Sequence, residues 1–271
     1  MPVMNFLVAF NGSEGSVAAL RYAASLAQID GAHVTAMLAH TSHEVIDRRS
    51  RWIPKEARAL LEQANSEVLR GIEELFDREC RALGLSGELQ LKDVTGRVDT
   101  VLSEAARYYD MLIVGAHDDT DDEHVTLHPD RIALMSGRPV VVVPAGYAAG
   151  ARHSHAALAW DGGRAAARAL SDSLRLLEGK SRVSVITVGQ HGGWPIADLL
   201  KHLDRHDIEA LHEDFPEWHP VAATLLAYCR RQDPTLLVLG AYEHSKFRED
   251  FLGGVTAEVL AKTRIPVLLS H

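Results

Sequence analysis

Two stretches of this chain, about 150 positions apart, repeat one local pattern. Residues 6–13 (FLVAFNGS) and 156–163 (AALAWDGG) each give a short apolar run, a polar residue and a turn pair, and an alanine-rich stretch follows. The halves also end alike, since MLIVG at 111–115 corresponds to LLVLG at 236–240 and RPVVVVP at 138–144 corresponds to RIPVLL at 264–269. Because each repeat has the length of a domain, the sequence predicts two related domains, over residues 1–147 and 153–271.

Within each half, short apolar runs alternate with stretches of helical periodicity. This alternation is typical of parallel strands joined by right-handed helical crossovers. The fold class is therefore α/β: two tandem Rossmann-like domains, each an open five-stranded parallel sheet with helices on both faces. Two boundaries can be tested directly: a helix over 164–178, followed by a strand over 182–188. No helix is predicted between the strands at 111–114 and 140–143.

Composition excludes several classes of protein. The formal net charge is −9, whereas a general nucleic-acid binder usually has a basic surplus, so no nucleic-acid partner is predicted. No apolar run approaches the ~20 residues that a membrane span needs, so no membrane association is predicted. The two cysteines, Cys80 and Cys229, lie one in each half without metal-binding spacing, which favours a reducing, cytoplasmic location.

The segment after the predicted strand at 235–239 carries the strongest functional signal. Gly240 ends that strand, a polar and basic stretch follows, and Gly253 and Gly254 then precede a predicted helix with Thr256 in its first turn. Glycines let a backbone approach a phosphate closely, and a helix N-terminus offers free amides. The alternative is that these glycines only satisfy turn geometry.

The whole chain resembles a tandem universal stress protein, with two domains of that family in one polypeptide. The resemblance rests on residues 159–163, 237–242, 251–256 and 265–269, in order and at the family's spacing. It implies an adenine-nucleotide α-hydrolase-like fold. It also implies a phosphate loop that reads Gly, two residues, Gly, nine residues, Gly and then Ser or Thr.

Mapped onto this chain, the loop places Gly240 and Gly253 on the first and third glycines. Glu243 replaces the second glycine, and Gly254 takes the hydroxyl position, with Val255 and Thr256 following. The resemblance further implies that Asp161 lies near the ribose or a metal ion, and that Val188 lies near the adenine. A carboxylate such as Glu243 would repel a triphosphate unless a Mg²⁺ ion intervenes.

The first half departs further from this pattern. Asn11 stands where the aspartate is expected, and the stretch from His117 to His124 is acidic, with no glycine between Gly115 and Gly137. That stretch is interpreted as a solvated acidic loop, with a weak divalent-metal site as the alternative. The first half is therefore predicted to be a degenerate universal stress domain.

Three hypotheses for function remain. The first is a stress-response sensor that binds ATP, with Mg²⁺, in the second domain. The second is a protein-interaction or dimerisation module without nucleotide. The third is a slow metal-assisted ATPase, although no catalytic residue or protein metal ligand is assigned. The resemblance also implies that strand 266–269 pairs with strand 140–143 to form an intramolecular pseudo-dimer. Homodimerisation and an unknown protein partner stay open. The aromatic residues Trp194, Trp218 and Tyr242 are expected to pack against a domain surface rather than stack on bases.

Overall fold

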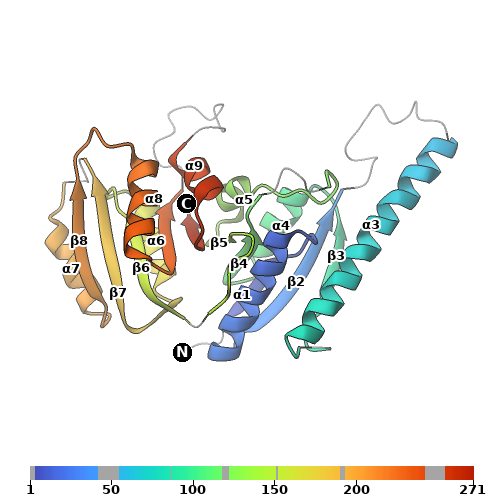
Figure 1. Ribbon diagram of the computed structural model, residues 1–271, viewed down its shortest axis with the longest axis horizontal. Helices are drawn as coiled ribbons and strands as arrows, with labels where there is room; N and C mark the ends of the chain where they lie inside the picture. Colours follow the sequence, from blue (N-terminus) through green and yellow to red (C-terminus); the bar gives the residue numbers. More distant parts are fainter. Residues whose placement is uncertain are drawn as a thin grey trace.

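The computed structural model describes residues 4–41, 55–85, 87–117, 122–150, 152–189, 193–241 and 254–271. Within these residues the strands form one ten-stranded sheet, in the order β3-β2-β1-β4-β5-β10-β9-β6-β7-β8 (Figure 1). The first five strands and the last five form the two halves of that sheet.

The elements alternate along the chain as the sequence predicts. In the first half they are β1 (Asn5–Ala9), α1 (Glu14–Asp30), β2 (His33–His40), α3 (Lys55–Ala82), β3 (Leu91–Thr95), α4 (Val98–Ala106), β4 (Met111–Gly115), α5 (Pro129–Ser136) and β5 (Val140–Val143). In the second half they are β6 (His153–Ala159), α6 (Arg164–Ser173), β7 (Leu177–Val188), α7 (Ile196–Asp204), β8 (Glu209–Phe215), α8 (Val221–Gln232), β9 (Leu236–Gly240), α9 (Val255–Lys262) and β10 (Val267–Ser270).

All strand pairs within each half are parallel, and the halves meet through one antiparallel pair. Leu268 of β10 lies opposite Val141 of β5, and the flanking residues continue this register. The predicted pairing of 266–269 with 140–143 is therefore confirmed, and the predicted fold class is confirmed with it. Because the two terminal strands cover each other, neither half leaves its last strand as an open edge.

The sheet has a hydrophobic core on each face. Alternate residues of β1 contribute to opposite cores, since Phe6 and Val8 belong to one and Leu7 and Ala9 to the other. Helices α1, α3, α6 and α7 supply the first core, and α4, α5, α8 and α9 supply the second. Each core contains residues from both halves, so the packing is continuous across the β5–β10 pair.

Three local predictions are wrong. Helix α6 ends at Ser173 rather than near 178, and β7 begins at Leu177 rather than at Arg182. Leu177 pairs with His153 at the start of β6, and the register shifts between His153 and His155. Helix α5 lies where no helix was predicted; it begins at Pro129 and is followed by Gly137, whose positive φ of 65° suits a helix C-cap.

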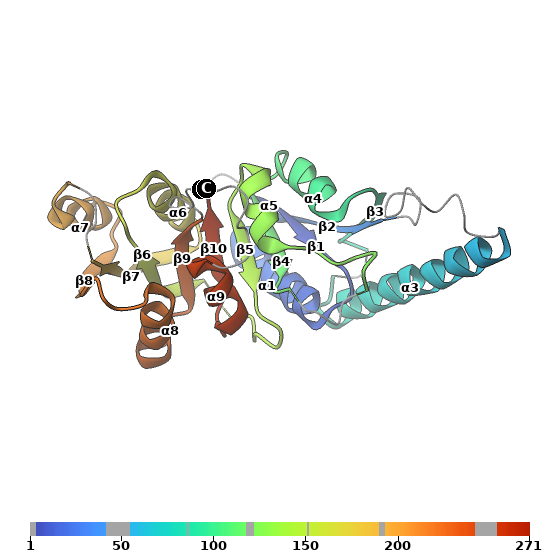
Figure 2. The same ribbon diagram turned by 90° about the horizontal axis from the view of Figure 1, so that it is seen from above.

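Helix α3 is the longest helix among the described residues, with 28 residues. Its C-terminal part packs on the core through Ile72, Phe76 and Cys80, whereas its N-terminal part extends past the edge of the sheet beyond β3 (Figure 2). In the described ranges, no helix combines the length and apolar character that crossing a bilayer requires.

Candidate functional site

The carboxyl ends of β6 and β9 form the natural ligand crevice of the second half. The chain winds from β6 outward to β7 and β8, and then returns to β9 on the other side of β6. Open parallel sheets bind ligands where the winding direction reverses in this way. Asp161 follows β6 and Gly240 ends β9, so two of the predicted site residues lie at the ends of neighbouring strands.

Asp161 builds the turn that leads into α6. Its carboxylate Oδ1 accepts a hydrogen bond from the Gly163 backbone N–H at 2.8 Å. Asn11 does the same in the first half, where its Oδ1 accepts from the Ser13 N–H at 3.2 Å. This shared turn gives both side chains a structural role whether or not a ligand is present.

Gly240 is required by packing. A Cβ atom at this position would lie 2.4 Å from the backbone nitrogen of Ala166 in the first turn of α6. Gly115 occupies the same place in the first half, where a Cβ would lie 2.4 Å from the backbone carbon of Gly15. Because both halves keep this glycine for the same contact, Gly240 alone does not identify a phosphate site.

Gly254, Val255 and Thr256 form the start of α9. Gly254 is the N-cap residue, with ordinary extended φ and ψ, and an added Cβ would meet nothing within 4 Å. Val255 is half-exposed and Thr256 is buried. Gly253 and Glu243, which the resemblance places in the same loop, lie outside the described residues.

A hollow of about 580 Å³ lies between the start of α9 and the start of α8. Its lining comprises Pro220, Val221, Ala222, Gly254, Val255, Ala257 and Glu258. Two helix N-termini border this space, and each offers amide hydrogens and the positive end of its dipole. The carboxylate of Glu258 would repel an anion bound in this hollow, although it is paired with the Lys262 ammonium group at 2.7 Å. The hollow thus has the backbone amides that an anion needs, together with one carboxylate that would repel the anion.

The predicted residues therefore divide into three places. Gly254 and Val255 line the hollow, while Asp161 and Gly240 stand at the ends of the central strands β6 and β9. Val188 ends β7, one strand further out, where it pairs with Phe215. Directly after it comes Gly189, where an added Cβ atom would lie 3.0–3.1 Å from atoms of Glu217.

The expectation that Trp194 and Trp218 pack against a domain surface is wrong. Their exposed fractions are 85% and 82%, the highest of the large apolar residues in the second half's described part. Trp194 precedes α7 and Trp218 follows β8, so both lie past the carboxyl ends of strands. Tyr242 lies outside the described residues.

In the first half, the chain's own segment 122–128 lies across the corresponding ends of β1 and β2. The backbone N–H of Thr41, just after β2, donates to the His124 carbonyl at 2.8 Å. The Thr41 hydroxyl donates to the same carbonyl at 3.0 Å, and the His124 ring Nδ1 lies 3.1 Å from the Thr41 carbonyl. The segment thus satisfies the donor and the acceptor that Thr41 presents at the strand end.

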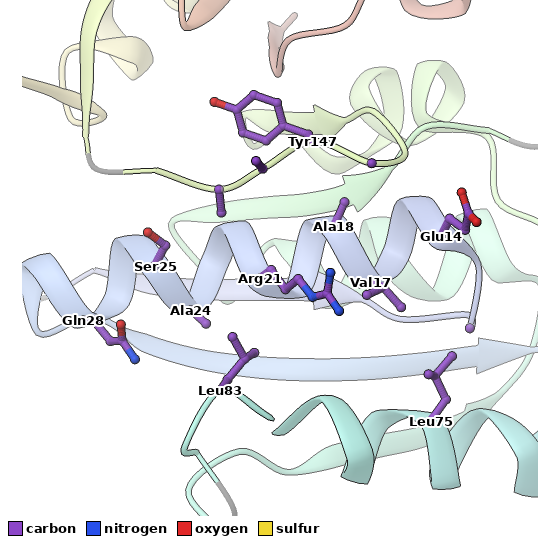
Figure 3. A pocket seen from close by; sticks show the side chains of 14 residues that line it. Glu14, Val17, Ala18, Arg21, Ala24, Ser25, Gln28, Leu75, Leu83 and Tyr147 are labelled. Atoms are coloured by element: carbon purple, nitrogen blue, oxygen red, sulfur yellow. The ribbon is translucent and has the colours of Figure 1, made fainter. Parts of the chain in front are cut away.

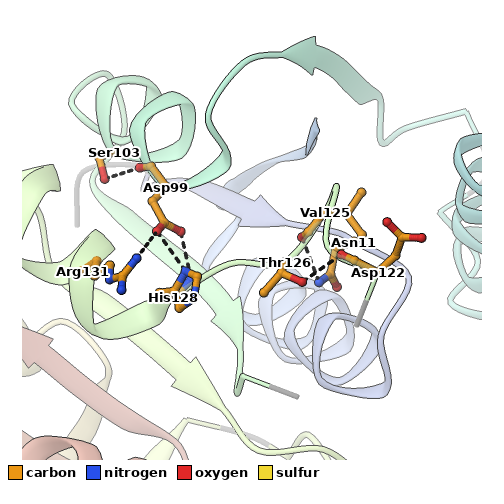
Figure 4. A network of polar contacts seen from close by, with 8 residues as sticks. All are labelled: Asn11, Asp99, Ser103, Asp122, Val125, Thr126, His128 and Arg131. Atoms are coloured by element: carbon orange, nitrogen blue, oxygen red, sulfur yellow. Dashed lines mark hydrogen bonds and ion pairs between the residues drawn. The ribbon is translucent and has the colours of Figure 1, made fainter. Parts of the chain in front are cut away.

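Three further hydrogen bonds hold the same segment, at Val125 and at His128. The Asn11 side-chain amide donates to the Val125 carbonyl at 3.3 Å, and Val125 itself is buried (Figure 4). Asp99 of α4 accepts hydrogen bonds from the backbone and ring nitrogens of His128, at 2.9 and 3.0 Å. Sequence reasoning missed this contact. It interpreted residues 117–124 as a solvated loop, although Val125 and the buried Leu127 directly after that stretch were visible apolar signals. Residues 118–121 of the acidic stretch lie outside the described residues.

Comparison with known proteins places these features in a family. The Universal stress protein family profile matches the chain twice, over residues 2–144 and 154–271. A universal stress protein from Archaeoglobus fulgidus has a similar structure, with 15% identity and a TM-score of 0.70; the match covers 98% of this chain and 96% of that one. A putative universal stress protein from Pseudomonas aeruginosa matches with 14% identity and a TM-score of 0.54, over 99% and 93% of the two chains. No curated protein sequence matches.

Proposed function

Because the chain belongs to the universal stress protein family, with two family domains in tandem, we propose that it is a stress-response sensor binding an adenine nucleotide in its second domain. The observation that carries the proposal is the hollow at the start of α9, where Gly254 and Val255 border a space between two helix N-termini. ATP is the nucleotide proposed, with Mg²⁺ offsetting the nearby carboxylates. Gly253, Thr256, Asp161 and Val188 are proposed to complete the site. We also propose that the two domains span residues 1–147 and 153–271 and that the protein is cytoplasmic.

The contrast between the halves supports binding in one domain only. In the first half, residues 122–128 already bond to the ends of β1 and β2. A ligand there would have to displace a buried Val125 and several hydrogen bonds, each worth about 1 kcal/mol net. The first domain is therefore proposed to be the degenerate partner.

Gly254 offers a sharp test of the proposal. Gly254→Asp should preserve the helix, since aspartate is a good N-cap residue and the position has room for a side chain. Its carboxylate would repel the phosphates, so ATP affinity should fall at least about tenfold at low salt. Gly254→Asn, which has the same shape without the charge, should bind ATP nearly as well as the unchanged protein. Isothermal titration calorimetry with ATP and Mg²⁺ measures all three proteins.

A second experiment asks whether the protein carries nucleotide when it is purified. Heat release followed by mass spectrometry should detect ATP, ADP or AMP. The absence of both co-purified nucleotide and calorimetric binding would contradict the proposal. Equal affinities of the Asp and Asn variants would show that the phosphates do not lie near α9.

The second candidate function is an interaction module that binds no nucleotide. The matching packing of Gly240 and Gly115 favours it, because it explains the first glycine of the loop without a ligand. A protein that fails both nucleotide tests and still assembles with itself or with a protein partner would have this function.

A further inference from the structure

Helix α3 carries an apolar stripe along its N-terminal part, which extends past the edge of the sheet. Residues 59–69, called here the α3 arm, contain Leu60, Leu61, Ala64 and Val68 at helical spacing. Leu60 is 68% exposed and Leu61 is 37% exposed. The arm projects beyond β3 in Figure 2, and its exposed leucines lie toward the start of the helix, whereas Val68 is half-buried and packs against the first core.

The other half of the same helix borders a trough. The trough has a volume of about 730 Å³, and its floor is the outer surface of α1. Residues 146–149 form one wall, and Leu75 and Leu83 of α3 form the other (Figure 3). Small residues, Ala18, Ala24 and Ser25, line the floor and leave room for another helix to approach.

Gly71 lies between the arm and the trough, and the described residues give no packing reason for a glycine there. Glycine in a helix interior destabilises it relative to alanine, yet an added Cβ at Gly71 would meet nothing within 4 Å. Neither a close intrachain contact nor a positive φ requires glycine here. A glycine with open space beside it is useful where a second helix crosses closely.

We propose that two copies of this chain pair antiparallel through α3, about a two-fold axis at the level of Ile72 and beside Gly71. The arm of each copy then lies in the trough of the other. Leu61 and Val68 are seven residues apart, about 10 Å along a helix, and Leu75 and Leu83 are eight apart, about 12 Å. An antiparallel alignment centred beside Gly71 therefore sets Leu61 against Leu83 of the second copy and Val68 against Leu75.

Charge fits the same alignment. It brings the exposed Glu67 of one copy to the level of the exposed Arg78 of the other, and the two-fold axis repeats this pair. Ala64 comes level with the ion pair that Arg21 and Glu79 form at 2.7 Å, where a small residue leaves that pair undisturbed. Pairing through terminal strands is already used inside the chain by β5 and β10, so a dimer needs another surface such as this one.

Oligomeric state in solution tests the proposal without reference to nucleotide. Sedimentation equilibrium should show the full chain as a dimer that dissociates on dilution. Leu61→Glu should raise the dissociation constant at least about tenfold, because it buries a charge in the trough. Ser66→Glu, on the opposite side of the arm, is the matched control and should leave the dimer unchanged.

Two further variants separate pairing from helix stability. Gly71→Leu should increase helicity by circular dichroism and still weaken the dimer, because it fills the crossing point. Glu67→Arg or Arg78→Glu alone should weaken the dimer several-fold, and the double exchange should restore it. A monomer at all concentrations overturns the proposal, as does a dimer that Leu61→Glu and Gly71→Leu leave intact or a double exchange without rescue.

Discussion

At the scale of single residues, Gly240 shows how one position can satisfy a motif and a packing contact together. The sequence motif assigns it to phosphate binding, whereas the structure places the first turn of α6 directly against it. The same contact at Gly115, in a half that lacks the rest of the motif, indicates that packing alone is sufficient to require this glycine.

Alanine substitution measures that contact. Gly240→Ala and Gly115→Ala should each lower the free energy of unfolding by about 3 kcal/mol, since the new methyl group would lie 2.4 Å from backbone atoms that cannot move independently. Urea titration of each variant provides the value. An unchanged stability for Gly240→Ala, beside a destabilised Gly115→Ala, would instead assign Gly240 to the ligand.

His153 links the two halves through a buried hydrogen bond. Its Nε2 lies 2.6 Å from the Tyr22 hydroxyl of α1, and burial lowers the pKa of His153 from 6.5 to about 4. Burial also raises the pKa of Tyr22, so the hydroxyl stays protonated and shares a hydrogen bond with the neutral ring. The unfolded chain therefore takes up a proton at this histidine at a higher pH than the folded chain does.

The consequence is a loss of stability in mild acid. As pH falls from about 6.5 to about 4, His153 should remove up to about 3 kcal/mol from the free energy of unfolding, and below that range the loss should stop. His153→Gln keeps an acceptor for Tyr22 and does not titrate, so its stability should vary less with pH. Urea midpoints across this range test the sign; equal slopes for the two proteins would contradict it.

At the scale of elements, the predictions that succeeded rest on patterns that span a whole strand or helix. The apolar runs at the starts and ends of the halves became β1, β4, β6 and β9 because their residues are buried on both faces. The α6 boundary failed because Leu174, Leu176 and Leu177 continue a helical spacing. In the structure Leu177 instead begins strand β7, where it pairs with His153. That tertiary contact has no local signal in the sequence.

The candidate site, too, could be predicted only where its residues carry a local sequence signal. Gly254 and Val255 were found because a glycine pair before a helix is a local signal, and they do line a hollow. The contribution of α8 was missed because Pro220 and Val221 come from a distant segment. The contact of residues 122–128 with Thr41 was also missed, since it joins segments that are distant in the sequence and partly uses backbone groups that any sequence has.

At the scale of the whole molecule, the two repeated halves share one sheet and two cores. The antiparallel pair of β5 and β10 makes a continuous sheet, and both core clusters draw residues from both halves. Val141 and Leu268 face each other at the join and are fully buried. The two halves should therefore unfold together rather than in two steps.

Leu268→Ala tests this coupling at the join. Removing a fully buried leucine side chain should cost about 3 kcal/mol. If the sheet unfolds as one unit, that loss should appear equally in β1 and β2 of the first half and in β6 and β7 of the second, although the substitution lies in the second half alone. Hydrogen exchange followed by mass spectrometry reports the opening free energy of each segment. Ser66→Glu on the exposed arm is the control and should leave all four strands unchanged. Lower protection confined to β6 and β7 would show that the halves open separately, because the join would then not transmit the loss from one core to the other.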